Sequence, residues 1–227
     1  MNKDLRESEL YQAPLGQEKQ VGIWFYCVLA ICIVLAMFFR VWWVTNYGGV
    51  EVDGRSMCQT LQDEDFLLMK KINDVEDLEY GDVIVVYVGD YPECKTVGGG
   101  YLIKRLIAKE GDKVKCTDGQ IYICYAGETE YQPLDEPYAY YTDKNAYDFQ
   151  NQEYVVGEGE IFFLGDNRNN SCDSRYKEFG GSHLSGKLYK ETDVYGVVPD
   201  WAIRYKETLN KINENNKKIS AFFQKIF

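Results

Sequence analysis

The hydrophobic pattern of the chain opens with one long apolar run. Residues 21–39 carry no charged side chain, and after Arg40 the run closes with two tryptophans, Trp42 and Trp43. A helix of about 20 apolar residues crosses a bilayer, and tryptophan is typical of its interface. The alternatives are a buried core helix and a cleaved signal peptide, but the run is longer than a signal-peptide core and no small-residue cleavage site follows it. The pattern therefore predicts a transmembrane anchor over residues 21–44.

The charges around this anchor predict its orientation. Residues 1–20 are polar and mixed in charge, which indicates a solvated tail. Basic residues favour the cytoplasmic side of a membrane helix. Near the run, the basic residues are Lys3, Arg6 and Lys19 before it and Arg40 and Arg55 after it. We therefore expect a cytoplasmic tail, a single pass through the cell membrane and a folded domain on the outer face.

Beyond residue 45 the pattern changes to short β-strands, which are rich in β-branched and aromatic residues and separated by Gly, Asp and Asn. The predicted strands are 66–70, 82–88, 101–108, 113–117, 120–125, 160–164, 194–198 and 201–205. Residues 126–154 lack a steady period and are expected to be irregular. The predicted fold class is mainly β: a single N-terminal transmembrane helix, then an extracytoplasmic domain of antiparallel β-sheets over residues 45–205.

The last segment, residues 206–227, has the pattern of an amphipathic helix. Its apolar positions are Leu209, Ile212, Ile219, Phe222, Phe223 and Ile226, with lysines elsewhere. Two interpretations remain open. The helix either packs on its own domain or lies on the membrane surface, for which lysine on the polar face and phenylalanine on the apolar face are suitable.

Composition excludes several kinds of partner. The 227 residues include 25 Lys and Arg against 36 Asp and Glu, a net charge of −11, so phosphate backbones should repel the chain and nucleic acid is not expected as a partner. Seven cysteines without a Cys-x-x-Cys pair, and His183 as the one histidine, offer zinc no site. We expect no metal. The hairpin turn Asp118-Gly119 sets Cys116 opposite Ile121, and the redox state of the cysteines is left open.

Two stretches carry candidate chemistry. On the strand 101–108, Leu102, Lys104 and Leu106 share a face. Burial between leucines lowers the pKa of a lysine, and a neutral amine can act as a base, although a lysine that snorkels to solvent gives the same pattern. The loop 165–175 follows an apolar strand and is dense in polar side chains. It either holds a fixed hydrogen-bonded geometry with Arg-carboxylate pairs or is a plain exposed loop.

A third stretch, residues 52–61, places Ser56 shortly after the anchor, although serine by itself is ordinary in turns. The ordered sequence motifs are Asp53-Gly54-Arg55-Ser56-Met57 with Thr60-Leu61, then Tyr80-Gly81-Asp82-Val83, then Ile103-Lys104-Arg105 leading to Gly111-Asp112, then Gly165-Asp166-Asn167-Arg168 with Asn170-Ser171 and Asp173-Ser174-Arg175. Together with the anchor, they make the chain resemble the bacterial type I signal peptidases, Ser-Lys membrane proteases that remove signal peptides from secreted proteins.

The resemblance implies a role for each matching residue. Ser56 matches the nucleophile, Lys104 the general base and Ser171 the serine that orients the lysine. The shallow pockets for small residues before the cut match Val50, Val52, Met57, Leu61, Leu102 and Ile103. Arg105 points away from Lys104 and is expected to brace its strand against Asp166 or Asp173, within a set of structural residues that also includes Arg168 and Arg175. No cofactor is implied.

The chain departs from the family pattern around the nucleophile. Gln59 stands where a proline is common, and Asn169 where an aspartate is common. Gly54 offers no hydroxyl to the oxyanion, so the backbone N–H of Ser56 is expected to carry more of that task. Cys58 is interpreted as a pocket or packing residue rather than the nucleophile.

These observations predict a membrane-anchored serine endopeptidase that cuts signal peptides of exported preproteins after small residues. One alternative is a catalytically silent, tethered member that binds secretory substrates without cleaving them. A second is a self-cleaving Ser-Lys repressor, which would carry a DNA-binding domain and a basic face that this acidic chain lacks.

Overall fold

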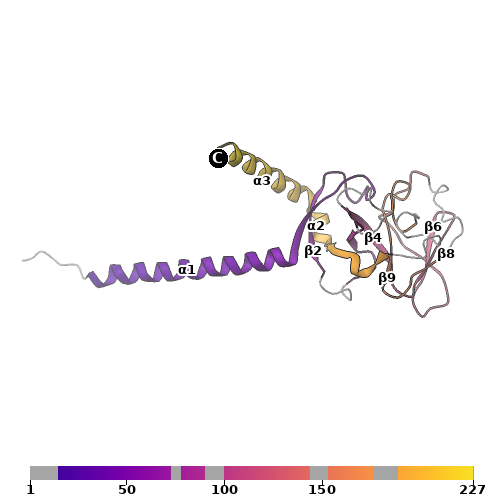
Figure 1. Cartoon of the computed structure of the whole chain (residues 1–227), viewed down its shortest axis with the longest axis horizontal. Coiled ribbons are helices and arrows are strands. Elements are labelled where there is room, and N and C mark those ends of the chain that lie inside the picture. The colour runs from indigo at the N-terminus through magenta and orange to yellow at the C-terminus, as the bar shows by residue number, and fades with distance from the viewer. Residues whose placement is uncertain (1–14, 73–77, 90–99, 144–152, 176–188, 227) are drawn as a thin grey trace, which may run out of the picture. The chain divides into compact units, whose positions relative to one another are not determined.

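The computed structural model describes residues 15–72, 78–89, 100–143, 153–175 and 189–226 of the chain. The chain divides into two compact units, residues 1–45 and residues 46–227. Helix α1 (Leu15–Asn46) makes up the described part of the first unit, and the second unit contains the β-sheets and two further helices (Figure 1).

Helix α1 contains the predicted anchor. Its segment Gly22–Asn46 is 25 residues long with a mean hydropathy of 2.5, which is long and apolar enough to cross a membrane. The helix begins at Leu15 and ends at Asn46, so it extends the predicted span of 21–44 in both directions. Its first turns occupy positions predicted to be tail, and residues 1–14 of that tail lie outside the described residues.

The second unit is built on two antiparallel sheets. Its strands are β1 (Tyr47–Glu51), β2 (Phe66–Lys71), β3 (Val83–Tyr87), β4 (Tyr101–Ala108), β5 (Lys113–Thr117), β6 (Gln120–Cys124), β7 (Gln132–Pro133), β8 (Glu153–Val155), β9 (Glu160–Leu164), β10 (Tyr189–Lys190) and β11 (Val194–Val198). The larger sheet has the order β1-β2-β11-β3-β4-β9-β10, and the smaller has the order β7-β6-β5-β8. The mainly β fold predicted from the sequence is confirmed.

Seven predicted strands are present with ends that differ by at most one residue, and the strand predicted over 201–205 is wrong. This segment is helix α2 (Asp200–Arg204). Pro199 precedes the helix and its carbonyl accepts a hydrogen bond from the Ala202 N–H at 2.8 Å. The negative charge of Asp200 in the first turn also interacts favourably with the positive end of the helix dipole, which stabilises the helix. The two apolar residues Ala202 and Ile203 then face the core side by side, as in one helical turn.

The strands that the sequence did not predict are short or rich in glycine. Strands β7, β8 and β10 have only two or three residues. Strand β1 contains Gly48 and Gly49, which weaken a strand pattern. The structure gives a reason for Gly49: a Cβ atom there would lie 2.8 Å from the ring of Phe66 on β2.

Both faces of the larger sheet are covered, which explains the continuous apolar sequence of β3. Val83 and Val85 pack into a cluster with Met57. Ile84 and Val86 point the other way, into a second cluster. A third cluster joins the two sheets and contains residues such as Val114, Ile121 and Phe162. In the smaller sheet Cys116 is paired with Ile121, as predicted, and Cys116 and Cys124 are free thiols.

Helix α3 (Lys206–Ile226) confirms the helix predicted at the C-terminal end. The helix packs its apolar residues on its own domain only in its first turns. Leu209 in its first turns packs against the cluster that contains Met57. Further along, the side chains of Ile212 and Ile219 are 52% and 55% exposed.

Candidate functional site

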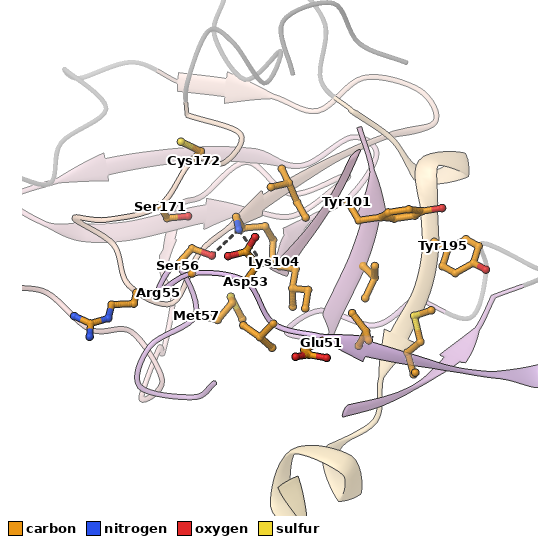
Figure 2. A pocket seen from close by; sticks show the side chains of 18 of the residues that line it. Glu51, Asp53, Arg55, Ser56, Met57, Tyr101, Lys104, Ser171, Cys172 and Tyr195 are labelled. Atoms are coloured by element: carbon orange, nitrogen blue, oxygen red, sulfur yellow. Dashed lines mark hydrogen bonds between the residues drawn. The ribbon is translucent and has the colours of Figure 1, made fainter. Parts of the chain in front are cut away.

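The centre of the site is a contact between Ser56 and Lys104. The Nζ atom of Lys104 lies 2.8 Å from Oγ of Ser56 and donates a second hydrogen bond of 2.8 Å to the carbonyl of Ile103 (Figure 2). Lys104 is only 3% exposed. The structure therefore brings together, at hydrogen-bond distance, two residues that lie 48 positions apart in the sequence.

Different elements supply the two residues. Lys104 lies on β4 opposite Ile84 of β3, on the same face as Leu102 and Leu106. Ser56 lies in the loop between β1 and β2, where Cys58 N–H donates to the Arg55 carbonyl at 3.2 Å. The regular strand places the lysine, and a turn exposes the serine to it.

Burial sets the acidity of the lysine. Loss of water around the ammonium group lowers the pKa of Lys104 to about 8, and the negative charge of Asp173 opposes this shift. An amine with this pKa is partly neutral near physiological pH. It can then accept a proton from a hydroxyl that lies within hydrogen-bond distance.

The loop 165–175 braces the lysine strand through a buried ion pair. The guanidinium of Arg105 donates two hydrogen bonds of 2.8 and 2.7 Å to the carboxylate of Asp166. The same carboxylate accepts a 2.5 Å hydrogen bond from the hydroxyl of Thr60, which lies in the loop of Ser56. Of the two partners predicted for Arg105, the structure selects Asp166. One carboxylate thus joins the two segments that carry Ser56 and Lys104.

Asp173 has the second set of buried contacts. It accepts the N–H of Gly165 at 3.0 Å and pairs with the guanidinium of Arg175 at 2.8 and 2.9 Å. Arg168 pairs with Glu136 and donates to the Gly165 carbonyl at 3.0 Å. The predicted Arg-carboxylate pairs are therefore present, and the interpretation of 165–175 as a plain exposed loop is wrong.

Two residues that support Ser56 were missed as site residues in the sequence. Asn167 donates its N–H to the Ser56 carbonyl at 2.9 Å and its side-chain amide to the Arg55 carbonyl at 3.0 Å. Gly165 approaches so closely that a Cβ atom would lie 2.6 Å from the Ser56 carbonyl oxygen and 2.1 Å from Oγ of Ser171. The density of polar residues after a buried strand was the available signal, but it did not indicate which of them contact Ser56.

Residues 126–143, predicted to be irregular, supply part of this support. The ring of Tyr138 lies 3.9 Å from the guanidinium carbon of Arg105. Tyr140 exchanges backbone hydrogen bonds with the loop: its N–H donates to Asp166 and its carbonyl accepts from Arg168, both at 2.8 to 2.9 Å. Asn169 accepts the N–H of Thr142 at 2.8 Å. The segment therefore holds the loop through both backbone and side-chain contacts.

A pocket of about 930 Å³ opens beside Ser56 and Lys104. Five of the six predicted pocket residues line it: Val50, Val52, Met57, Leu102 and Ile103. Leu61 does not line it, and its side chain is fully buried in the same cluster as Met57. The far end is lined by Tyr101 and Tyr195, which Figure 2 shows on the side of Lys104 away from Ser171.

Ser171, predicted to orient Lys104, lies in the same pocket. Its Oγ is buried and has no hydrogen-bond partner within the part of the chain that the structure describes. Cys58 lies outside the pocket lining, and its thiol is 3.7 Å from the side-chain oxygen of Gln62. Among the described residues, no group of three or more His, Cys, Asp or Glu side chains is placed to hold a metal ion.

Comparison with known proteins places the chain in a family. The model of the family described as signal peptidase, peptidase S26, matches residues 23–199. The chain belongs to this family, and it is a serine endopeptidase of the signal peptidase I type. Its relatives are named for the removal of signal peptides, and this is the activity that the comparisons support.

Several relatives match a large part of the chain. Signal peptidase I U of Bacillus subtilis is 31% identical over 157 residues, which cover 65% of this chain and 75% of the relative. A probable signal peptidase I-2 of Synechocystis is 33% identical over 129 residues, which cover 56% of this chain and 54% of the relative. A solved signal peptidase I from Enterococcus faecalis is 26% identical, with a TM-score of 0.38, over 56% of this chain and 100% of that structure.

Replacement of the buried lysine should stabilise the fold. The pKa of Lys104 falls from 10.5 to about 8 on folding, so the folded state binds fewer protons than the unfolded chain between these values. This costs stability at neutral pH, and the cost disappears as the pH rises from about 8 to 10.5. Lys104→Met should therefore raise the free energy of unfolding by about 3 kcal/mol at pH 7 and by less at pH 10.

Thermal unfolding of the full chain in detergent measures this effect. The exposed Lys113→Met on β5 is the matched control and should change stability little. A gain for Lys104→Met that is equal at pH 7 and pH 10 would contradict the predicted cause.

Loss of the carboxylate at Asp166 should destabilise the site. Arg105 is only 8% exposed, and Asp166→Ala leaves its charge buried without a partner. The expected cost is about 3–5 kcal/mol. The double variant Arg105→Met, Asp166→Leu removes both charges and should lose less than the single variant. Chemical unfolding measures the loss of stability of each variant, with Arg105→Met and Asp166→Leu measured separately as well. If the loss in the double variant equals the sum of the losses in these two single variants, the ion pair is not the cause.

Proposed function

We propose that this protein is a membrane-anchored endopeptidase that removes signal peptides from exported preproteins with Ser56 as nucleophile and Lys104 as general base. The observation that carries the proposal is the 2.8 Å contact between Oγ of Ser56 and Nζ of the buried Lys104. A nucleophile within hydrogen-bond reach of a base is the arrangement that covalent catalysis by serine requires.

The reaction follows from this geometry in two halves. Ser56 Oγ attacks the scissile carbonyl carbon while its proton moves to Nζ of Lys104, and the protonated lysine then gives that proton to the leaving amine. An acyl-enzyme remains on Ser56. Lys104 next takes a proton from water, the hydroxide attacks the ester, and the proton returns to Ser56 Oγ as the acid product leaves.

Attack by Ser56 places negative charge on the oxygen of the substrate's scissile carbonyl, and hydrogen-bond donors must stabilise this charge. The backbone N–H of Ser56 has no hydrogen-bond partner among the described residues, so it is available for this task. Gly54 supplies no hydroxyl, and its own N–H donates to Asp63 at 2.8 Å. The side-chain amide of Asn167 donates to the Arg55 carbonyl at 3.0 Å, and this carbonyl belongs to the same peptide group as the Ser56 N–H, so the contact fixes the direction of that N–H. We assign Ser171 the role of orienting Lys104 in the acyl-enzyme, when Ser56 is acylated and its Oγ no longer contacts the lysine amine.

Two strand edges favour an extended substrate. Strand β1 is at the edge of the larger sheet, and β4 pairs with β9 only from Arg105 onward, so among the described residues the backbone of residues 101–104 has no strand on that side. A peptide that enters the pocket can pair with such edges and place alternate side chains against the wall. Met57 and the branched side chains of Val52 and Ile103 line this wall, and with the family resemblance they support small apolar residues before the cut.

The proposed location is the cell membrane. Helix α1 contains 25 residues of suitable composition, about 37 Å of helix against a hydrocarbon core of about 30 Å. The basic residues before the span favour a cytoplasmic N-terminus and a catalytic domain on the outer face. Nucleic acid has no place in this proposal, because the chain carries a net charge of −11. The tethered, silent alternative lacks support, since both reacting groups are in contact.

Cleavage of a preprotein by the full chain in detergent tests the assignment. Ser56→Ala and Lys104→Ala should each reduce the rate by roughly three orders of magnitude or more, because each removes a group that takes part in bond making. Cys58→Ala is the control for a thiol nucleophile and should keep the parental rate. Cleavage by Ser56→Ala at the parental rate, or loss of activity in Cys58→Ala alone, would show that the nucleophile is misassigned.

The pH dependence should follow the protonation of Lys104. Below its pKa of about 8, the neutral fraction of the amine rises about tenfold per pH unit, so kcat/KM should rise steeply from pH 6 and level off above about 8. Initial rates on a soluble peptide measure this profile, with unfolding followed in parallel at each pH. A rate that is flat from pH 6 to 9.5 is incompatible with a lysine base.

A further inference from the structure

Helix α3 has two distinct faces, and beyond the contact of Leu209 near its start, the face that contacts the β domain is the polar one. Lys206 donates to the Thr60 carbonyl at 2.9 Å, Asn210 bonds Asp65 and the Phe66 N–H, and Lys217 pairs with Glu51. At about 100° per residue, these three positions fall within about 40° of one another around the helix. Polar contacts therefore hold α3 on its own domain.

The apolar stripe of α3 lies on another side. Ile212 and Ile219 are seven residues apart and project about 140–180° from the face that carries Asn210 and Lys217. Both isoleucines are more than half exposed. A helix that packed on its domain through its apolar face would bury these side chains instead. The apolar stripe thus faces away from the only surface that α3 contacts among the described residues.

Lysines run beside the apolar stripe. The dipeptide Lys-Ile occurs three times at a spacing of seven residues, at 211–212, 218–219 and 225–226. The helix carries five lysines and two glutamates, a net charge of +3, so the rest of the chain carries −14 out of the total of −11. Positive charge is therefore concentrated where the exposed isoleucines are.

We propose that α3 lies flat on an anionic lipid surface, with Ile212 and Ile219 buried at the level of the head groups and Lys211 and Lys218 on lipid phosphates. Both lysines are exposed. A helix with a lysine-rich polar face and isoleucine and phenylalanine on the other has the composition of interfacial helices. Seven charged residues in 21 exclude a membrane span for α3, since charged side chains are costly at the centre of a bilayer.

A second copy of the chain is the competing occupant, and the charges disfavour it. The flank of the isoleucine stripe opposite the lysines carries Leu209 and Asn216, neither of which is acidic. The two glutamates of α3, Glu207 and Glu214, lie about 120–160° around the helix from the isoleucine stripe, so two α3 helices packed through this stripe would bring lysines together with the carboxylates turned away. An anionic membrane supplies the missing negative charge, with about 1 kcal/mol of attraction per lysine near the surface.

A photoreactive amino acid placed in the full chain tests the proposal. Position 219 lies on the isoleucine stripe, and position 221 lies about 160° around the helix and is also exposed. The two variants, each in nanodiscs that contain phosphatidylglycerol and phosphatidylcholine, are irradiated and analysed by intact mass. We expect at least fivefold more lipid adduct from position 219 than from position 221, and a ratio at least twofold lower in discs of phosphatidylcholine alone.

The outcomes that overturn the proposal are distinct. Equal lipid labelling at the two positions would show that the isoleucine stripe does not face the membrane. A cross-link between two chains from position 219 would assign the stripe to a second copy. A labelling ratio that does not change with anionic lipid would remove the role of the lysines. Because no cleavage is measured, these results are independent of the assignment of Ser56 and Lys104.

Discussion

The structure depends on one costly feature, a lysine amine buried beside a serine hydroxyl. An ammonium group without water is unstable, so burial of Lys104 shifts its pKa down to about 8. Nearby carboxylates would reverse this shift if their charges were uncompensated. Asp166 and Asp173 are the two that oppose it, and each is bound to an arginine, Arg105 and Arg175 respectively. The arginines therefore do more than brace a loop, because they also limit the field that would return the lysine to its charged form.

The same loop positions both reacting groups. Asp166 holds the lysine strand through Arg105, and the next residue, Asn167, holds the serine loop through the Ser56 carbonyl. Gly165 keeps the backbone close enough for both contacts, since a side chain there would collide with Ser171 and Ser56. A shift of this loop would move the serine and the lysine together. The distance between them therefore changes less than it would if each were held by a separate segment.

The sequence was sufficient for the parts of the fold that depend on local pattern. Strands such as β4 and β5 have clear composition and were predicted with correct ends. The local pattern did not predict contacts between segments that lie far apart in the sequence. Tyr138 and Glu136 support Arg105 and Arg168 from a segment without periodicity. Leu61 matched a pocket position by motif, yet it lies in the core, because the turn after Ser56 directs it inward. At 201–205 the alternation resembled a strand, but Pro199 begins a helix.

Helix α3 is a second case in which the sequence pattern identified an element but not the contacts that it makes. Periodicity identified it as amphipathic, and an apolar stripe would ordinarily be assigned to the protein core. The contacts reverse that assignment, since polar residues such as Asn210 hold the helix to an acidic strand end at Asp65. An enzyme whose substrate is itself inserted in a membrane gains from a second attachment beyond a single helix, because one spanning helix leaves the domain free to rotate about the helix axis. Two attachments of different chemistry, one apolar and spanning and one basic and superficial, would restrict that rotation and keep the pocket at the height where the substrate chain leaves the lipid.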